Sequence, residues 1–73
     1  MKSNIRAERA RLHMSAKEVA SAIGVHENTV IRWESGAATP RLRNIYRLSE
    51  LYDCTPDYLL GYTDDRHRNV VGI

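Results

Sequence analysis

The sequence has few of the residues from which disulfides, metal sites and membrane spans are made. Its 73 residues contain one cysteine, Cys54, which excludes an internal disulfide and has no Cys or His neighbour at zinc-binding spacing. No apolar run approaches the roughly 18 residues of a membrane span, and no apolar block follows the first charged residues as in a signal peptide. We therefore expect a cytoplasmic protein with no metal, no cofactor and no membrane contact, in which Cys54 packs as a small apolar residue.

The groups of an enzyme active site are also missing. No serine or cysteine has the partners of an activated nucleophile, no carboxylate pair is indicated, and Ser15 and Ser35 fall at expected helix ends. A chain of 73 residues allows one domain, near the size at which one apolar core suffices. The hydrophobic content of 42% is too high for a disordered chain. The sequence therefore predicts one small folded domain that is not an enzyme.

Positive charge is concentrated in the first two thirds of the chain. Residues 1–47 contain nine Lys and Arg against four Glu, a net charge of +5. Residues 48–73 contain two Arg against five acidic residues, a net charge of −3. This distribution suits contact of the amino-terminal part with a polyanion, although an ordinary solvated surface can show the same imbalance.

Apolar spacing and turn residues predict five helices and no sheet. We expect helices over about 4–13, 16–23, 27–35, 39–52 and 56–60, the fourth starting at Thr39 or Pro40. Ser15 and Glu18 match a capping box, and Gly24 suits the left-handed turn that ends a helix. The first helix has Ile5, Arg9 and Leu12 on one face, and the fourth repeats Leu42, Ile45, Leu48 and Leu51 or Tyr52.

The segment Ser15 to Gly36, SAKEVASAIGVHENTVIRWESG, has the pattern of a helix, a glycine-centred turn and a second helix. This arrangement presents one helix to the major groove of DNA. Together with IRAERARLHMS before it and the segments TP-R-L and TPDYLLG after it, the chain resembles the lambda-repressor-like, Cro-type helix-turn-helix family (XRE type). The resemblance implies an all-α, compact five-helix DNA-binding domain over residues 1–61. Residues 62–73 are left as a short tail that is disordered or contacts a partner.

The resemblance also assigns DNA contacts to individual residues. The exposed start of the third helix would face base edges with Glu27, Asn28 and Arg32. Asn28 can pair with adenine and Arg32 with guanine through two hydrogen bonds each, and Glu27 can accept one from cytosine. Contacts to the DNA backbone are expected from Ser15, Lys17, Thr29, Arg41 and Arg43. Without DNA binding, all of these would be ordinary exposed polar side chains.

Arg9 is explained by the same resemblance. The family pairs an arginine on the first helix with a glutamate late in the third, and Glu34 holds that position, so we expect a structural Arg9–Glu34 ion pair. Two positions depart from the family pattern. Ala16 replaces a glutamine that often contacts phosphate, and His26 replaces the Ser or Thr that normally caps the third helix. We expect Trp33 to be a core residue rather than a platform for a base.

These features together predict a sequence-specific regulator of a bacterium or bacteriophage that binds double-stranded DNA. A repressor acting as a homodimer on a near-palindromic operator is the leading hypothesis. The alternative is an antitoxin-type DNA-binding protein that also holds a protein partner through its C-terminal surface, as the apolar end Val70–Ile73 suggests. The late tyrosines would pack in the core or form a subunit contact: Tyr46, Tyr52, Tyr58 and Tyr62.

Overall fold

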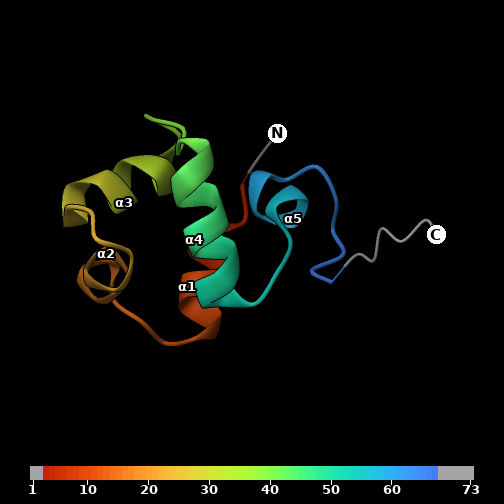
Figure 1. The fold of residues 1–73 in the computed structure, drawn as a ribbon, viewed down its shortest axis with the longest axis horizontal. Coiled ribbons are helices and arrows are strands. Elements are labelled where there is room, and N and C mark those ends of the chain that lie inside the picture. The colour runs from red at the N-terminus through yellow and green to blue at the C-terminus, as the bar shows by residue number, and fades with distance from the viewer. Residues whose placement is uncertain (1–2, 68–73) are drawn as a thin grey trace.

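The computed structural model describes residues 3–67, which form five helices (Figure 1). In chain order they are α1 (Ile5–Arg11), α2 (Ala16–Ile23), α3 (Glu27–Ser35), α4 (Leu42–Tyr52) and α5 (Pro56–Leu60). The all-α, five-helix architecture predicted from the sequence is confirmed. Figure 1 shows α2 and α3 at one end of the molecule and α5 at the other, with α4 between them. None of the helices between residues 3 and 67 has the length and apolar character needed to cross a membrane.

Residues close together in the sequence fix the start of α2 and the turn between α2 and α3. The Ser15 hydroxyl accepts a hydrogen bond from the Glu18 N–H at 3.0 Å, and the Glu18 carboxylate accepts one from the Ser15 N–H at 2.7 Å. The predicted capping box is therefore present. Gly24 ends α2 at φ 78°, a left-handed conformation that glycine adopts without a steric penalty. The Val25 N–H then bonds to the Ala20 carbonyl at 3.0 Å, and the chain turns so that α3 packs on α2.

One apolar core joins all five helices. Its most deeply buried apolar side chains come from every helix in turn: Ile5, Val19, Val30, Leu48, Tyr52 and Leu59. Short helices of this kind are marginal alone in water, so their stability comes from this shared packing. The position of α3 is therefore fixed by its neighbours.

The first helix is shorter than predicted and buries a different face. It ends at Arg11, because His13 adopts a left-handed φ of 55° and leaves the helix. Its fully buried residues are Ile5 and Glu8, whereas Arg9 is only half-buried. A carboxylate thus occupies a core position that the apolar pattern did not indicate.

The start of the fourth helix also differs from the prediction. The helix begins at Leu42 with Arg41 as its N-cap residue, and not at Thr39 or Pro40. Pro40 is buried ahead of the helix, so its ring packs in the loop rather than in a first helical turn. Leu42, predicted on the apolar face, is 64% exposed because it lies at the end of the helix beyond the core.

The last helix begins and ends as predicted. The Thr55 hydroxyl accepts a hydrogen bond from the Tyr58 N–H at 3.2 Å, and Pro56 occupies the first turn. Gly61 ends the helix in a left-handed conformation with φ 86°. These are local signals of the kind that a sequence carries in its turn residues.

The segment after α5 returns to the domain. The Thr55 N–H donates to the Arg66 carbonyl at 2.9 Å, which places the described part of the expected tail, residues 62–67, against the end of α4 and the start of α5. The apolar end Val70–Ile73 lies outside the described residues.

Candidate nucleic-acid interface

Helix α3 has an apolar face toward the core and a polar face toward solvent. Val30 and Trp33, three residues apart, are buried. Glu27, Asn28 and Arg32 lie away from that side and are exposed. The three residues predicted to contact bases therefore share an accessible surface, while Trp33 is a core residue, as predicted.

An ion pair with two hydrogen bonds joins α3 to α1. The Arg9 Nε donates to Glu34 Oε2 at 2.6 Å and its Nη2 to Oε1 at 2.9 Å. The Glu34 side chain is only 8% exposed. The hydrogen bond to Glu34 raises the pKa of Arg9 above its ordinary value, and Arg9 Nη1 also donates to the Met14 carbonyl at 3.1 Å. The pair expected from the sequence is thus formed, and it fixes the second half of α3 against α1.

The start of α2 offers hydrogen-bond donors to solvent. Lys17 is exposed there, next to Ser15. The Ser15 oxygen and N–H are both engaged in the capping box, so its hydroxyl proton is the group that it can still donate. The first N–H groups of an α-helix have no partner within the helix, and its positive end favours anions. This surface is chemically suited to a phosphate.

The start of α3, unlike that of α2, has no side-chain cap. His26 is the N-cap residue, but its side chain makes no capping hydrogen bond and is exposed. Thr29, whose N–H bonds to the His26 carbonyl at 3.0 Å, is half-buried. Thr29 is therefore less accessible than the candidate base-contacting residues beside it.

Two further cations lie at the other end of α3. Arg41 and Arg43 are both exposed at the start of α4, which Figure 1 shows beside the end of α3. The loop that carries the chain between these helices is tied back to α3, because the Ala38 N–H donates to the Arg32 carbonyl at 3.1 Å. The two arginines are thus held near α3 by a short, anchored connection.

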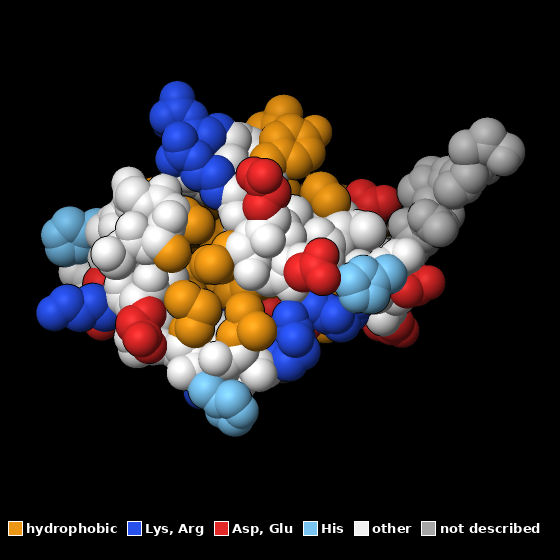
Figure 2. Space-filling view, turned by 60° about the horizontal axis from the view of Figure 1, so that its bottom comes forward, with side chains coloured by type: hydrophobic (Ala, Val, Ile, Leu, Met, Phe, Trp, Pro, Cys, Tyr) orange, Lys and Arg blue, Asp and Glu red, His pale blue; other side chains and the backbone are white. Residues whose placement is uncertain are grey.

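Some basic side chains of the domain are neutralised by ion pairs within it, and the others are available to bind a negatively charged partner. Three arginines are engaged in them: Arg9, Arg11 and Arg66. The basic residues that form no ion pair between residues 3 and 67 are Arg6, Lys17, Arg32, Arg41, Arg43 and Arg47. On the face of the molecule shown in Figure 2, basic side chains lie in separate groups with acidic side chains among them, and do not form one continuous basic patch.

A model of the helix-turn-helix family matches residues 5–59 of this chain. The chain belongs to the XRE-type helix-turn-helix family of DNA-binding regulators. The predicted resemblance is confirmed. The matched family and its named members are DNA-binding transcriptional regulators and not enzymes.

Several curated proteins are similar to it. Repressor protein C2 of Salmonella phage P22 is 33% identical over 60 residues, which are 82% of this chain and 28% of that protein. The regulator DicA of Escherichia coli K12 is 29% identical over 62 residues, which are 85% of this chain and 46% of DicA. An uncharacterised HTH-type regulator of Archaeoglobus fulgidus is 29% identical over 65 residues, which are 89% of this chain and 93% of that protein. The chain thus spans less than half of the two named regulators.

A solved structure shares the fold. The crystal structure of the P22 c2 repressor in complex with a synthetic operator matches with a TM-score of 0.76 and 32% identity. The match covers 81% of this chain and 89% of the repressor chain. The five helices of this helix-turn-helix protein are therefore arranged as in a repressor domain.

Glu8 is the centre of an ion-pair cluster that the sequence did not indicate. Its carboxylate, 2% exposed, accepts hydrogen bonds from Arg66 Nη2 at 2.7 Å, Arg66 Nε at 2.9 Å and Arg11 Nε at 2.9 Å. The Tyr58 hydroxyl also donates to it at 3.2 Å. Burial alone would raise the pKa of Glu8, but the hydrogen bonds from Arg66 and Arg11 outweigh burial and lower it. Arg11 lies three residues after Glu8, so the sequence itself could have indicated that pair. Arg66 is 58 residues from Glu8, and no local pattern connects the two.

The late tyrosines do not form one cluster. Tyr52 is fully buried and its hydroxyl has no hydrogen-bond partner among the described residues. Tyr58 is half-buried against Glu8. Tyr46 and Tyr62 are 54% and 62% exposed. Tyr52 is therefore a core residue, and a contact with a second subunit could involve only the exposed ones.

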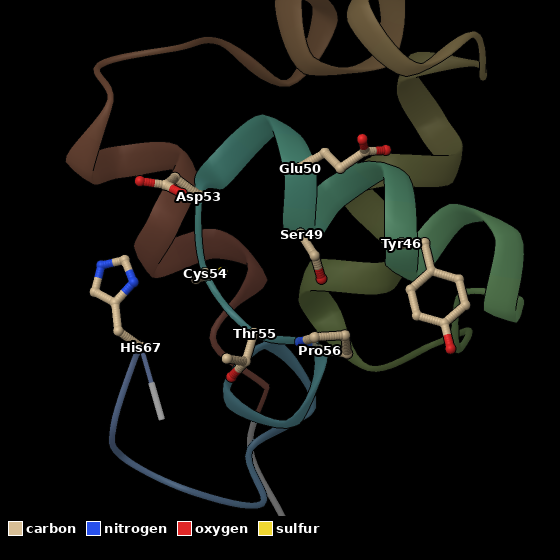
Figure 3. Close-up of a pocket in the computed structure, with 8 residues that line it drawn as sticks. All are labelled: Tyr46, Ser49, Glu50, Asp53, Cys54, Thr55, Pro56 and His67. Carbon is tan, nitrogen blue, oxygen red and sulfur yellow. The ribbon is translucent and has the colours of Figure 1, made fainter. Parts of the chain in front are cut away.

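A shallow hollow of about 810 Å³ lies between α4, α5 and the segment ending at His67 (Figure 3). Its lining residues are Tyr46, Ser49, Glu50, Asp53, Cys54, Thr55, Pro56 and His67. Burial raises the pKa of Cys54 to about 11, so its thiol is neutral near pH 7 and is a poor nucleophile. The hollow therefore contains no activated cysteine. No group of His, Cys, Asp and Glu in residues 3–67 could hold a metal ion.

Proposed function

We propose that this protein is a transcriptional repressor that acts in the cytoplasm and binds double-stranded DNA with α3 in the major groove. The observation that supports this most is the exposed set Glu27, Asn28 and Arg32 on α3. The opposite face of that helix is anchored in the core, and the Arg9–Glu34 pair clamps its second half. A rigid helix with free polar side chains is what direct contact with base edges requires.

Within this proposal, base contacts and backbone contacts have different roles. Asn28 would pair with adenine and Arg32 with guanine, each contributing roughly 1–3 kcal/mol of discrimination. Glu27 would accept a hydrogen bond from cytosine. The DNA backbone would be held by Ser15, Lys17, Thr29, Arg41 and Arg43, which fix the register without selecting a sequence.

We further propose that two copies bind a near-palindromic operator. A single small domain contacts only a few base pairs, whereas a pair with two-fold symmetry doubles the recognised sequence. The exposed Tyr46 and Tyr62 are candidates for the contact between copies, since tyrosine is enriched at interfaces. The antitoxin-type alternative depends on Val70–Ile73, which lie outside the described residues, and no residue between 3 and 67 favours it.

Selection of bound sites from random duplex DNA tests the proposal. The expected result is an enriched, near-palindromic sequence whose half-sites are about one helical turn apart, roughly 34–36 Å. The affinity for that sequence should fall steeply as salt concentration rises, because bound phosphates release counterions. A protein that enriches no sequence and binds no duplex even at low ionic strength would contradict the proposal.

A further inference from the structure

We infer that Ile31 contacts the methyl group of a thymine in the major groove and selects thymine at one operator position. This inference rests on the proposed function and adds a specificity-determining residue to it. Ile31 lies on α3 but outside the core, with 45% of its surface exposed. The other large exposed apolar residues of the described chain lie on other segments: Leu42, Tyr46 and Tyr62.

The position of Ile31 places it among the candidate base contacts. It is one helical turn after Asn28 and one turn before Ser35, and it is next to Arg32; all three are exposed. Three residues of an α-helix span about 4.5 Å along its axis. Successive base pairs are separated by about 3.4 Å. Ile31 would therefore meet the base pair that Asn28 contacts or the next one.

The chemistry of this face is complementary to the groove. Its other exposed side chains, Glu27, Asn28, Arg32 and Ser35, carry hydrogen-bonding groups, and Ile31 is the apolar member. The major-groove edges of base pairs likewise consist of donors and acceptors, with the thymine methyl as their apolar group. Isoleucine is branched at Cβ and keeps one preferred rotamer in a helix, so little conformational freedom is lost on contact.

The surface beside Ile31 also leaves room for a base edge. A shallow hollow of about 290 Å³ is lined by Ile31 together with Arg6, Arg9, Glu34 and Ser35. The Arg9–Glu34 ion pair forms part of this hollow and holds it rigid. Arg6, exposed on the α1 side, supplies a positive charge there, as contact with a nearby phosphate would require.

Deoxyuridine substitution tests the inference, because it removes only the methyl group of a thymine. The operator selected by the wild-type protein is synthesised with each thymine replaced in turn, and binding is measured by fluorescence anisotropy at one salt concentration. At one position in each half-site, loss of the methyl should weaken wild-type binding about fourfold, the factor expected for one buried methyl group. With Ile31→Ala, the same replacement should have no effect, and Ile31→Val should give an intermediate effect.

Leu42→Ala is the matched control, since it removes an exposed aliphatic side chain of similar size from α4. It should keep the wild-type pattern of deoxyuridine effects. Two results would overturn the inference while leaving the proposed function intact. In the first, removing the methyl group from any thymine of the selected operator leaves binding unchanged. In the second, removal of a thymine methyl weakens binding by Ile31→Ala as much as binding by the wild type. A change in oligomeric state with Ile31→Ala, without a change in thymine dependence, would assign Ile31 to a protein contact and also overturn it. Failure of the wild-type protein to select any duplex would instead contradict the proposed function.

Discussion

Glu8 and Arg9 are neighbours on α1 whose ion pairs hold two distant parts of the domain. Arg9 bonds to Glu34 near the end of α3, at 2.6 Å, and Glu8 bonds to Arg66 beyond α5, at 2.7 Å. Both partners are remote in sequence, so one turn of α1 connects the candidate DNA-contacting helix and the carboxy-terminal segment to the same core. The stability of the domain and the placement of α3 should therefore respond to changes at these two residues.

Replacing Glu34 with Gln should destabilise the domain. The variant leaves the charge of Arg9 without its counter-charge, and the expected loss in free energy of unfolding is about 3 kcal/mol, the low end for breaking a buried pair. The low end applies because the Arg9 side chain keeps 21% exposure. Urea unfolding measures the loss. Glu27→Gln on the same helix is the control and should cost about 0.5 kcal/mol; equal stability of Glu34→Gln and wild type would exclude the clamp.

The Glu8 cluster should make stability depend on acid pH. The pKa of Glu8 is lowered from 4.5 in the folded chain, so its stabilising effect is complete above pH 4.5 and is lost as pH falls through the lower, folded pKa. Glu8→Gln should be less stable than wild type at pH 7, and this difference should shrink below pH 4.5. Urea unfolding across that range, with Glu50→Gln as an exposed control, measures it. A gap between the two proteins that stays constant with pH would contradict the assignment.

Arg66 should stabilise the domain through Glu8. Arg66→Ala removes two hydrogen bonds to a buried carboxylate, and the expected cost is about 2 kcal/mol, as for hydrogen bonds to a charged group. A double-mutant cycle with Glu8→Gln should give a coupling of about 1 kcal/mol or more, because the residues are in direct contact. Arg43→Ala, an exposed arginine with no ion pair among residues 3–67, should change stability by less than about 0.5 kcal/mol. If the losses in free energy of unfolding of the two single variants simply add up in the double variant, Arg66 does not stabilise the domain through Glu8.

Cys54 should be slow to alkylate in the folded protein. Burial raises the pKa of its thiol from 9.0 to about 11, which lowers the fraction of reactive thiolate about a hundredfold at pH 8. Labelling with iodoacetamide, followed by mass spectrometry, should be correspondingly slower in buffer than in denaturing urea. The single cysteine makes the assay unambiguous. Similar rates in the two conditions would mean that the thiol is not protected by packing.

Local signals in the sequence were enough to predict much of this fold. The Ser15–Glu18 capping box and the left-handed Gly24 each depend on a few consecutive residues. The Arg9–Glu34 pair was expected through the family resemblance, since spacing alone does not bring residues 25 apart together.

Features that depend on distant parts of the chain were not predictable in the same way. Glu8 was not expected in the core, because its neutralising partner Arg66 is 58 residues away. Proline is favoured in a first helical turn, yet Pro40 is buried in the loop before α4, and its residue type alone does not indicate that placement. The exposure of Glu27, Asn28 and Arg32 follows from helix periodicity, but which bases they would contact depends on docking to DNA.

We propose that α3 selects the DNA sequence while the start of α4 holds the DNA backbone. Arg32→Ala and Arg43→Ala separate these two roles when site selection is repeated, and affinity is measured against salt concentration, for both variants. Arg32→Ala should relax the preference at one operator position, at a cost of roughly 1–3 kcal/mol for the preferred base. Arg43→Ala should keep the same preferred sequence, weaken all sites alike and reduce the salt slope by about one unit. If both variants weaken binding by the same factor, reduce the salt slope equally and keep the wild-type base preference, α3 and the start of α4 do not divide the roles in this way.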